Sequence, residues 1–162
     1  MLFCCDERKE TMNYTDTLIN RYSDPAVQTA MKTYFCELGL NITNWDGLFQ
    51  EMEQDGANFT FIRKNETGNV TGFIQFTTMN LESWFFSAKC GFIREFWVQE
   101  DLRCQGHGTA LLNQAEEWLR QQGCLCILLT TDTEPDFYKK HGYRHEPGIQ
   151  ARNKDKVYVK RL

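Results

Sequence analysis

The stretch Ile93–Leu119 decides the fold of this chain, and it divides into three segments: IREFWV (93–98), QEDLRCQGHG (99–108) and TALLNQAEEWL (109–119). The first segment is an apolar run, which predicts a buried strand. The third segment repeats apolar residues at the spacing of one helix face, at Ala110, Leu111, Ala115, Trp118 and Leu119. A strand therefore leads through a short turn into a helix.

The turn between this strand and this helix has the composition of an anion site. It carries a cation, Arg103, and two glycines, Gly106 and Gly108. The N–H groups of a first helical turn have no partner within the helix, and the helix dipole adds about half a positive charge there. Glycine also lets the backbone approach a bulky anion, because it has no Cβ. An ordinary strand-to-helix turn is the alternative interpretation.

The spacing of these residues excludes two common phosphate-binding motifs. A P-loop would end in Gly-Lys-Ser/Thr, and the dinucleotide motif would need a third glycine where Leu111 stands. A second informative segment follows, CLCILLTTDTEPDFYKKHGYRHE (124–146). It predicts a strand at Cys124–Leu129 and a short helix at Pro135–His141 with proline in its first turn, which Gly142 ends.

Together the two segments resemble the GNAT N-acetyltransferase superfamily. Residues 103–108 are similar to its Arg/Gln-x-x-Gly-x-Gly/Ala loop, which wraps the coenzyme A pyrophosphate, and residues 137–143 are similar to its F-Y-x-x-x-G-F/Y segment. The second match lies in the expected order and at the expected distance after the first. The resemblance spans nearly the whole chain and is poorest at the first strand. It implies an N-acetyltransferase with acetyl-CoA as donor and a primary amine as acceptor.

The resemblance also implies where coenzyme A binds. The pyrophosphate is expected on the glycine loop, and the pantetheine arm on main-chain groups at the end of the central strand. The thioester carbonyl would then meet the N–H of Val98, a donor aimed at the developing oxyanion. Where the family often has asparagine and alanine, this chain has Thr131 and Glu134. The expected coenzyme contacts are Phe96, Trp97, Val98, Arg103, Cys104, Gln105, Gly106, His107, Gly108, Thr109 and Thr131.

Glu95 and Tyr138 are the predicted catalytic residues. An alkylammonium has a pKa of about 10.4 and must lose a proton before it attacks. Many family members place an acid at or beside Glu95, where it removes this proton or binds the ammonium. Its neighbours Phe96 and Trp97 should raise its pKa by desolvation, whereas pairing with Arg94 or another cation at the sheet surface is the purely structural alternative. Tyr138 matches the family tyrosine that protonates the leaving thiolate; its alternative is a tyrosine of an amphipathic helix.

The composition fits one globular domain. Of 162 residues, 41% are hydrophobic and 14% aromatic, so the chain can build a packed core, and we expect one domain over residues 1–162. The net charge of −4 argues against a nucleic-acid partner and suits a cationic acceptor. No apolar run approaches the ~20 residues that cross a membrane, so no membrane association is expected.

The seven cysteines predict a reducing compartment. Their number is odd and no secretory signal core precedes them, so we expect free thiols and a cytoplasmic protein. Cys124 and Cys126 share one face of a predicted strand without the further ligands of a zinc site, which predicts buried apolar side chains and no metal. His107, His141 and His145 lie in turns or at helix ends and are expected to be surface groups.

Two helices are expected in the N-terminal half. Ser23-Asp24-Pro25 predicts the start of a helix that runs to about Cys36, and Asn44 predicts the cap of a second helix. Before them, residues Leu2–Cys5 are a candidate first strand, and Thr11–Tyr22 reads as part strand and part helix.

Further strands complete the pattern. Residues 57–63 and 70–78 predict a hairpin, and residues 143–146 and 157–159 an antiparallel pair. The order of elements predicts an α/β (α+β) fold of the GNAT type, with a mixed, mostly antiparallel sheet flanked by helices.

Residues 78–91 are expected to connect this hairpin to the central strand, and they carry three consecutive aromatic side chains, Trp84, Phe85 and Phe86. These aromatics either pack on the N-terminal helices or form a wall of the acceptor site. Trp84 and Phe85 are accordingly candidate acceptor-binding residues, together with Glu95.

The acceptor is expected to be a small cationic amine. Residues 92–98 and the aromatic segment before them look similar to the small-molecule members of the family, such as polyamine and aminoglycoside acetyltransferases. A peptide or protein N-acetyltransferase and a non-catalytic acyl-CoA-binding sensor are the alternatives, although the presence of Glu95 and Tyr138 counts against a sensor. Many relatives are dimers, and the aromatics at 84–86 could also serve an interface, so a homodimer is a further possibility.

Overall fold

The computed structural model describes residues 12–162, so the strand expected at Leu2–Cys5 lies outside it. The elements in chain order are β1 (Thr15–Ile19), α1 (Pro25–Glu37), α2 (Trp45–Gln54), β2 (Phe59–Lys64), β3 (Val70–Glu82), β4 (Ser87–Val98), a 3-10 turn η1 (Glu100–Leu102), α3 (His107–Gln121), β5 (Cys126–Thr130), α4 (Pro135–Lys140), β6 (Arg144–His145) and β7 (Val157–Arg161).

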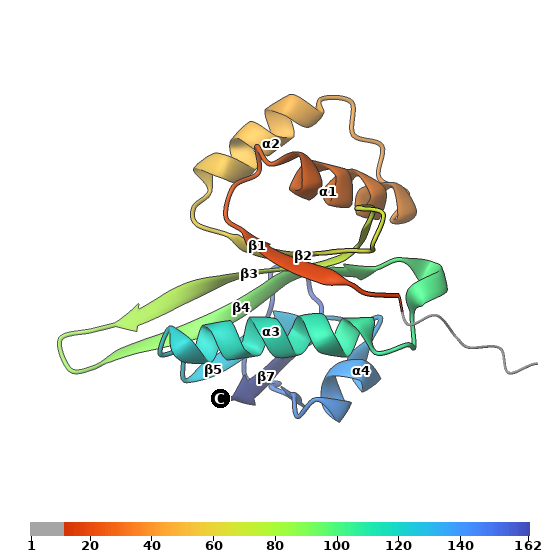
Figure 1. Cartoon of the computed structure of the whole chain (residues 1–162). Helices are drawn as coiled ribbons and strands as arrows, with labels where there is room; N and C mark the ends of the chain where they lie inside the picture. Colours follow the sequence, from red (N-terminus) through yellow and green to blue (C-terminus); the bar gives the residue numbers. More distant parts are fainter. Residues whose placement is uncertain (1–11) are drawn as a thin grey trace, which may run out of the picture.

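The strands form one seven-stranded sheet in the order β1-β2-β3-β4-β5-β7-β6. Every neighbouring pair is antiparallel except β4 and β5, which are parallel. Helices α1 and α2 lie on one face of the sheet, and α3 and α4 lie on the other (Figure 1). This arrangement confirms the predicted fold class.

Both N-terminal helices begin where the sequence predicts. Asp24 lies just before the first-turn proline, and its side chain accepts the N–H of Ala26. The Asn44 side chain accepts the N–H of Gly47. These bonds satisfy N–H groups that the helices leave without partners. In the segment before them, the described residues form β1 and a turn but no helix, so the mixed strand and helix prediction for Thr11–Tyr22 is wrong in its helical part.

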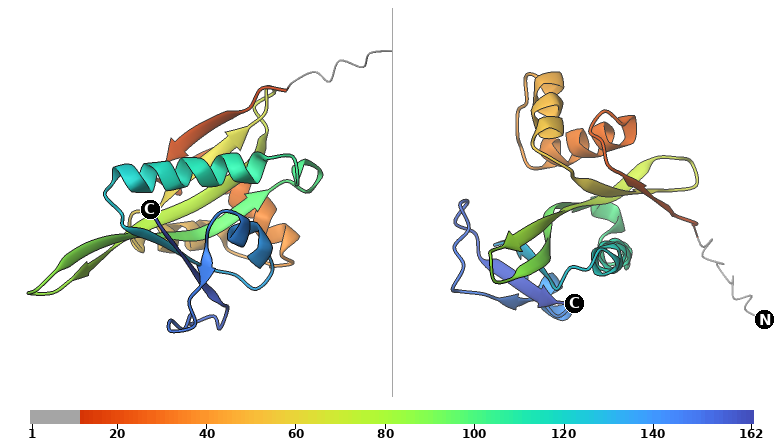
Figure 2. Two further views of the ribbon diagram at one scale, coloured as in Figure 1. Left: turned by 90° about the horizontal axis from the view of Figure 1, so that it is seen from below. Right: turned by 90° about the vertical axis from the view of Figure 1, so that its left-hand side faces the viewer.

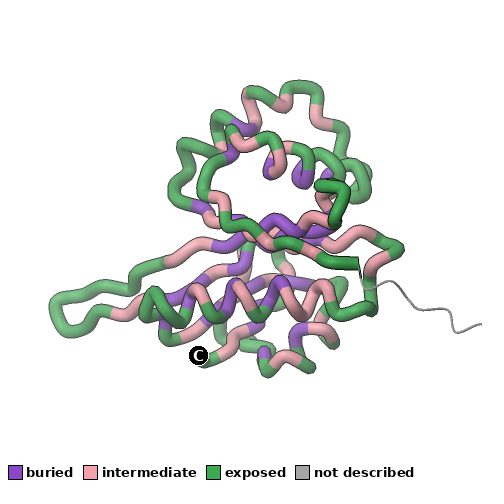
Figure 3. Tube along the Cα trace, in the orientation of Figure 1, coloured by how far each residue is buried: buried purple, intermediate pink, exposed green. Residues whose placement is uncertain are grey.

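Two apolar cores lie on the two faces of the sheet. The larger packs α3 and α4 against residues such as Ile74, Phe76 and Ile93, and the smaller packs α1 and α2 against Phe73 and Trp97. Figure 3 shows that the buried positions follow the central strands and the inner sides of the helices. The sheet between the two cores is therefore the part of the molecule that positions the site.

Strands β3 and β4 form a hairpin that projects beyond the rest of the sheet (Figure 2). Their pairing runs from Gly72 with Val98 to Glu82 with Ser87, so residues 78–91 are the outer halves of two long strands and not a connection. The hairpin carries Trp84–Phe86 away from the helices, because the strands pair with each other all the way to the turn. The prediction that these aromatics pack on the N-terminal helices is therefore wrong.

Candidate active site

Strand β4 has a free edge where it approaches α3. It pairs with β5 at only three positions, Cys90, Gly91 and Phe92, and its remaining residues pair with β3 alone. Gln99 donates its N–H to β3, whereas the Val98 carbonyl accepts from Arg103 on the other side. Because N–H and C=O of one residue in an antiparallel strand point the same way, the Val98 N–H faces the free edge.

A β-bulge sets the direction of Glu95. Ile93 and Glu95 pair with two consecutive residues of β3, so Arg94 has no partner there and the side-chain alternation shifts by one position. Ile93 lies in the core beneath α3, whereas Trp97 packs in the core with α1 and α2. Glu95, two residues before Trp97, therefore points to the α1 side of the sheet.

The surroundings of Glu95 raise the pKa of its carboxyl above the ordinary value. Burial raises the pKa of the Glu95 carboxyl, and the nearby Tyr34 hydroxyl and Arg94 charge only partly oppose this effect. The Arg94 guanidinium instead bonds to Asn58 Oδ1 at 3.0 Å and Asp55 Oδ2 at 3.4 Å. The expected rise in the pKa of Glu95 is confirmed. Arg94 bonds to Asn58 and Asp55, so it does not form the ion pair with Glu95 that was the structural alternative.

Glu95 opens into a cavity of about 310 Å³ that also contains Tyr138. Tyr34 on α1 and Thr131 after β5 line the same cavity. The cavity is acidic, since one cationic side chain, Arg94, faces four carboxylates among its lining residues, Glu95, Asp132, Glu134 and Asp155. A cationic group is therefore favoured inside it.

Tyr138 on α4 is 8% exposed and is held by aromatic neighbours. Its ring lies 6.5 Å from that of Phe96 and 5.7 Å from that of Tyr143, measured between centroids. Burial raises the pKa of the Tyr138 hydroxyl, and the charges of Glu134 and Glu95 raise it further. The hydroxyl is thus a proton donor at neutral pH.

The glycine loop has the strand–turn–helix form that the sequence predicts. Gly106 caps α3 with φ +89°, a left-handed conformation, and accepts the first helical N–H, from Ala110. The first turn of α3 carries no acidic side chain, so no side chain of that turn offsets the positive end of the helix dipole. A Cβ at Gly108 would lie 3.5 Å from the Phe137 ring, which shows how closely the start of α3 approaches α4. Cys104 and Gln105 are exposed in the loop.

The Arg103 side chain has partners that the sequence did not reveal. Its Nε donates to the Val98 carbonyl at 2.9 Å, and its guanidinium pairs with Glu37 at 2.9 Å. Glu37 also accepts the Trp97 indole N–H at 2.8 Å. Arg103 thus fastens the loop to the end of β4 and to α1, and half of its side chain stays exposed.

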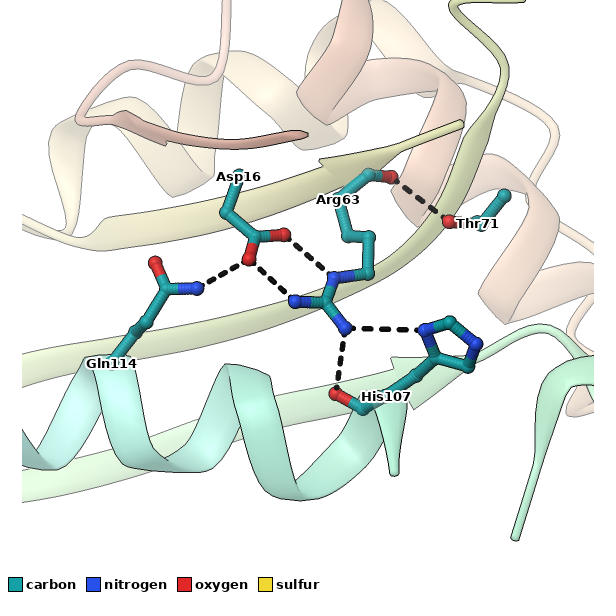
Figure 4. Close-up of polar contacts among 5 residues, drawn as sticks. All are labelled: Asp16, Arg63, Thr71, His107 and Gln114. Carbon is teal, nitrogen blue, oxygen red and sulfur yellow. Dashed lines mark hydrogen bonds and ion pairs between the residues drawn. The ribbon is translucent and has the colours of Figure 1, made fainter. Parts of the chain in front are cut away.

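His107 is part of a polar network rather than a free surface group, which corrects the prediction (Figure 4). Arg63 on β2 donates to Nδ1 of His107 at 3.1 Å and makes a two-bond ion pair with Asp16 on β1, at 2.7 and 2.6 Å. The Gln114 amide on α3 also donates to Asp16. Burial, then the Arg63 charge, lower the pKa of His107. The network ties the start of α3 to both strands.

Two threonines expected at the coenzyme have internal partners. His141 donates from Nδ1 to the Phe137 carbonyl at 2.8 Å, and its Nε2 lies at hydrogen-bond distance from the Thr109 hydroxyl, at 3.1 Å. His141 is therefore not a partnerless surface group, and the pair joins α3 to α4. Thr131 is buried, and its hydroxyl accepts the N–H of Glu134 at 3.2 Å.

The structure therefore brings together Glu95, Tyr138 and Thr131, and gathers residues 103–109 at the start of α3. It does not bring Trp84 or Phe85 to the cavity. Tyr34 is a cavity residue that the sequence did not reveal, because its spacing with other apolar residues of α1 indicates only a core position.

The family comparison agrees with this geometry. The profile of the acetyltransferase (GNAT) family matches residues 22–143, which is most of the chain. The chain therefore belongs to the GNAT acetyltransferase family and is an acetyltransferase that uses acetyl-CoA as donor. A comparison with curated protein sequences found no significant match.

Solved structures show the same fold. NAA60 of Arabidopsis thaliana in complex with acetyl-CoA aligns with a TM-score of 0.67 at 13% identity, over 93% of this chain and 99% of that chain. A GNAT-family acetyltransferase of Staphylococcus aureus Mu50 gives 0.65 at 15% identity, over 91% and 99%. An acetyltransferase of Trypanosoma brucei gives 0.64 at 18% identity, over 86% and 99%.

Residues 12–162 contain neither a metal-binding cluster nor a membrane-spanning helix. No group of three or more His, Cys, Asp or Glu side chains there is placed to hold a metal ion. No helix in this part of the chain has the length and apolarity to cross a membrane.

Gly106→Val should abolish binding of acetyl-CoA, because a β-branched residue resists a φ of +89° and the anion-binding turn is lost. Binding is measured as the stabilisation of the protein by the ligand, which for the unaltered chain is ~2.7 kcal/mol at a hundredfold excess over Kd.

Gly68→Val is the matched control, since Gly68 has φ +82°, has equally open space around it and lies in the β2–β3 turn. The control should lose stability but keep the ligand-induced shift. A Gly106→Val protein that acetyl-CoA stabilises normally would show that the loop is not the binding site.

Proposed function

We propose that this protein transfers the acetyl group of acetyl-CoA to the primary amine of a small cationic metabolite or antibiotic, of the polyamine or aminoglycoside kind. One observation carries the proposal: Glu95 from β4 and Tyr138 from α4 line the same acidic cavity beside the free edge of β4. A carboxylate and a phenol in one cavity supply the two proton transfers that amide formation needs.

The chain has groups suited to hold the coenzyme. The N–H groups at the start of α3 would bind the pyrophosphate, since they carry the positive end of the helix dipole and no acid opposes it. The free edge of β4 offers main-chain groups of Phe96 and Val98 to an extended arm. Trp97 turns its indole toward Glu37 and its main-chain groups toward β3, so we do not expect it to bind the arm.

Glu95 acts on the acceptor. Its charge attracts the ammonium, and it accepts the proton that the amine must lose, directly or through a water molecule. The raised pKa of Glu95 makes it a better base than an ordinary carboxylate. Because burial by Tyr34 and the strand limits hydration, the carboxylate and the ammonium attract each other more strongly than they would in water.

Tyr138 and Val98 act on the leaving side. Bound acetyl-CoA supplies the activated thioester: the amine nitrogen forms the C–N bond, the C–S bond breaks, and the sulfur leaves as a thiolate. Tyr138 donates its phenolic proton to that thiolate, which has a pKa near 8.5. The Val98 N–H is directed to the free edge, where it would stabilise the negative charge on the carbonyl oxygen.

The acidity of the cavity supports a cationic acceptor, and the state of the thiols supports a cytosolic location. All five cysteines in the described residues, Cys36, Cys90, Cys104, Cys124 and Cys126, are free. Free thiols persist where the surroundings are reducing, as in the cytosol.

The proposed function is tested by a search for products. The purified protein is incubated with acetyl-CoA and a mixture of polyamines, aminoglycosides, amino acids and short peptides, and acetylated products are read by mass spectrometry. We expect acetylation of a small amine. Acetylated peptides alone would favour the peptide acetyltransferase, and no product from a protein that acetyl-CoA stabilises would favour the acyl-CoA sensor.

Tyr138→Phe should lower kcat by on the order of 100-fold with little change in the affinity for acetyl-CoA, because only the proton donor is removed. Single-turnover kinetics and ligand-induced stabilisation measure the two effects separately. Tyr143→Phe is a suitable control, since Tyr143 is a buried tyrosine of the same cluster outside the cavity. An unaltered rate in Tyr138→Phe would remove this residue from the mechanism.

Glu95→Gln should remove the lower ascending limb of the pH profile of kcat/KM. As a base, Glu95 works only when deprotonated, so activity is lost as the pH falls through its pKa, which lies above the ordinary value of 4.5. A second limb near pH 10, from the amine itself, should remain in both proteins. If Glu95→Gln raises KM but leaves kcat unchanged, Glu95 only binds the ammonium.

A further inference from the structure

The tip of the β3–β4 hairpin presents three aromatic side chains to solvent. Trp84 is 101% exposed, Phe85 95% and Phe86 61%. The turn itself is ordered by hydrogen bonds, because the Ser83 hydroxyl accepts the N–H groups of Phe85 and Phe86 at 3.1 and 3.2 Å. A contiguous apolar patch on a well-formed turn is typical of an interaction site, since monomeric proteins seldom expose one.

An apolar groove of about 370 Å³ lies near the base of the same hairpin. Met79, Phe92 and Leu128 come from the three adjacent strands β3, β4 and β5, and Ile149 and Val157 complete its wall. Phe92 pairs with Leu128 in the parallel register, so the two side chains share one face of the sheet. Met79 and Ile149 are 38% and 45% exposed, which shows that this part of the face has no cover of its own.

We propose that a second copy of the chain fills this groove with its aromatic hairpin tip, and that the contact is reciprocal. The tip at Trp84 lies five residues along the strand from Met79 in the groove wall, a span of ~16 Å. Two hairpins placed side by side in opposite directions would therefore bring each tip to the other groove. Such a self-complementary contact closes with twofold symmetry.

The available area is sufficient for a stable dimer. One buried aromatic side chain removes ~150–250 Å² from solvent, so the six rings of two tips contribute ~900–1,500 Å². The two grooves add their own surface, which brings the total into the range of ~1,200–2,000 Å² that specific interfaces bury. The charges favour a protein partner over an anionic lipid surface, because Glu82 adjoins the tip and the net charge is −4.

The groove borders the catalytic cavity, since Thr130 and Asn153 line both. The aromatic tip of the second copy would thus close one end of the acceptor cavity. This consequence rests on the proposed function, whereas the dimer itself does not.

Sedimentation velocity of the full chain at ~1–100 µM tests the dimer, because the fraction of dimer rises with protein concentration. We expect a species of twice 19.1 kDa for the unaltered chain. Two variants should be monomers: the double variant Trp84→Ser, Phe85→Ser at the tip, and the single variant Ile149→Lys in the groove. Leu40→Ser is the matched control, an exposed leucine in the α1–α2 loop, and should stay dimeric.

Cross-linking locates the contact. A photoreactive benzoylphenylalanine in place of Phe85, in an equal mixture of ¹⁵N-labelled and unlabelled protein, should capture residues 149–157 of the other copy. The mass shift of the cross-linked peptides distinguishes capture between copies from capture within one chain. Capture within one chain alone would contradict the proposal.

A monomer at every concentration, or a dimer that survives the Trp84→Ser, Phe85→Ser change, would overturn the proposal. Binding of the monomer to neutral phosphatidylcholine vesicles through Trp84 would identify a lipid surface as the partner instead. Stabilisation by acetyl-CoA checks that each variant is folded, since the coenzyme loop lies at the opposite end of β4. These measurements do not depend on catalysis, so failure of the proposed function leaves the dimer result unaffected.

Discussion

The early separation of β4 from β5 is the constraint on which the site depends. The two parallel strands share only three paired positions, and each then runs on to its own helix, β4 to α3 and β5 to α4. Continued pairing would have used the main-chain groups of Phe96 and Val98 within the sheet. Because the strands part, these groups stay available, and the loops that follow both strands face one opening.

Opposite electrostatic fields lie on the two sides of this opening. The start of α3 is positive, through its unopposed dipole, and the cavity at Glu95 is negative, through its four carboxylates. An anionic donor and a cationic acceptor are therefore drawn to different places beside the same strand edge. The Arg63–Asp16 pair fixes this division, since it anchors His107 at the beginning of α3.

Local patterns predicted the parts of the site that depend on short stretches of chain. The strand–turn–helix at 93–119 was predicted from spacing within one motif, whereas the pairing of Glu95 with Tyr138 was expected only from the resemblance to the family. Contacts across long separations were not. Arg103 meets Glu37 across 66 residues, and the Arg63–His107 contact spans 44. No periodicity in a single chain encodes such pairs, and the bulge at Arg94 becomes visible only beside β3.

That bulge has a consequence for sequence variation in this protein. The unpaired Arg94 shifts the two-residue alternation of β4 by one position. As a result, Glu95 points to the α1 side of the sheet and Phe96 to the α3 side. The number of residues from Gly91 to Val98 is therefore constrained, because one residue more or fewer would exchange the faces of the sheet to which Glu95 and Phe96 point. The turn at 83–86 lies outside this interval, so the faces to which Glu95 and Phe96 point do not depend on it.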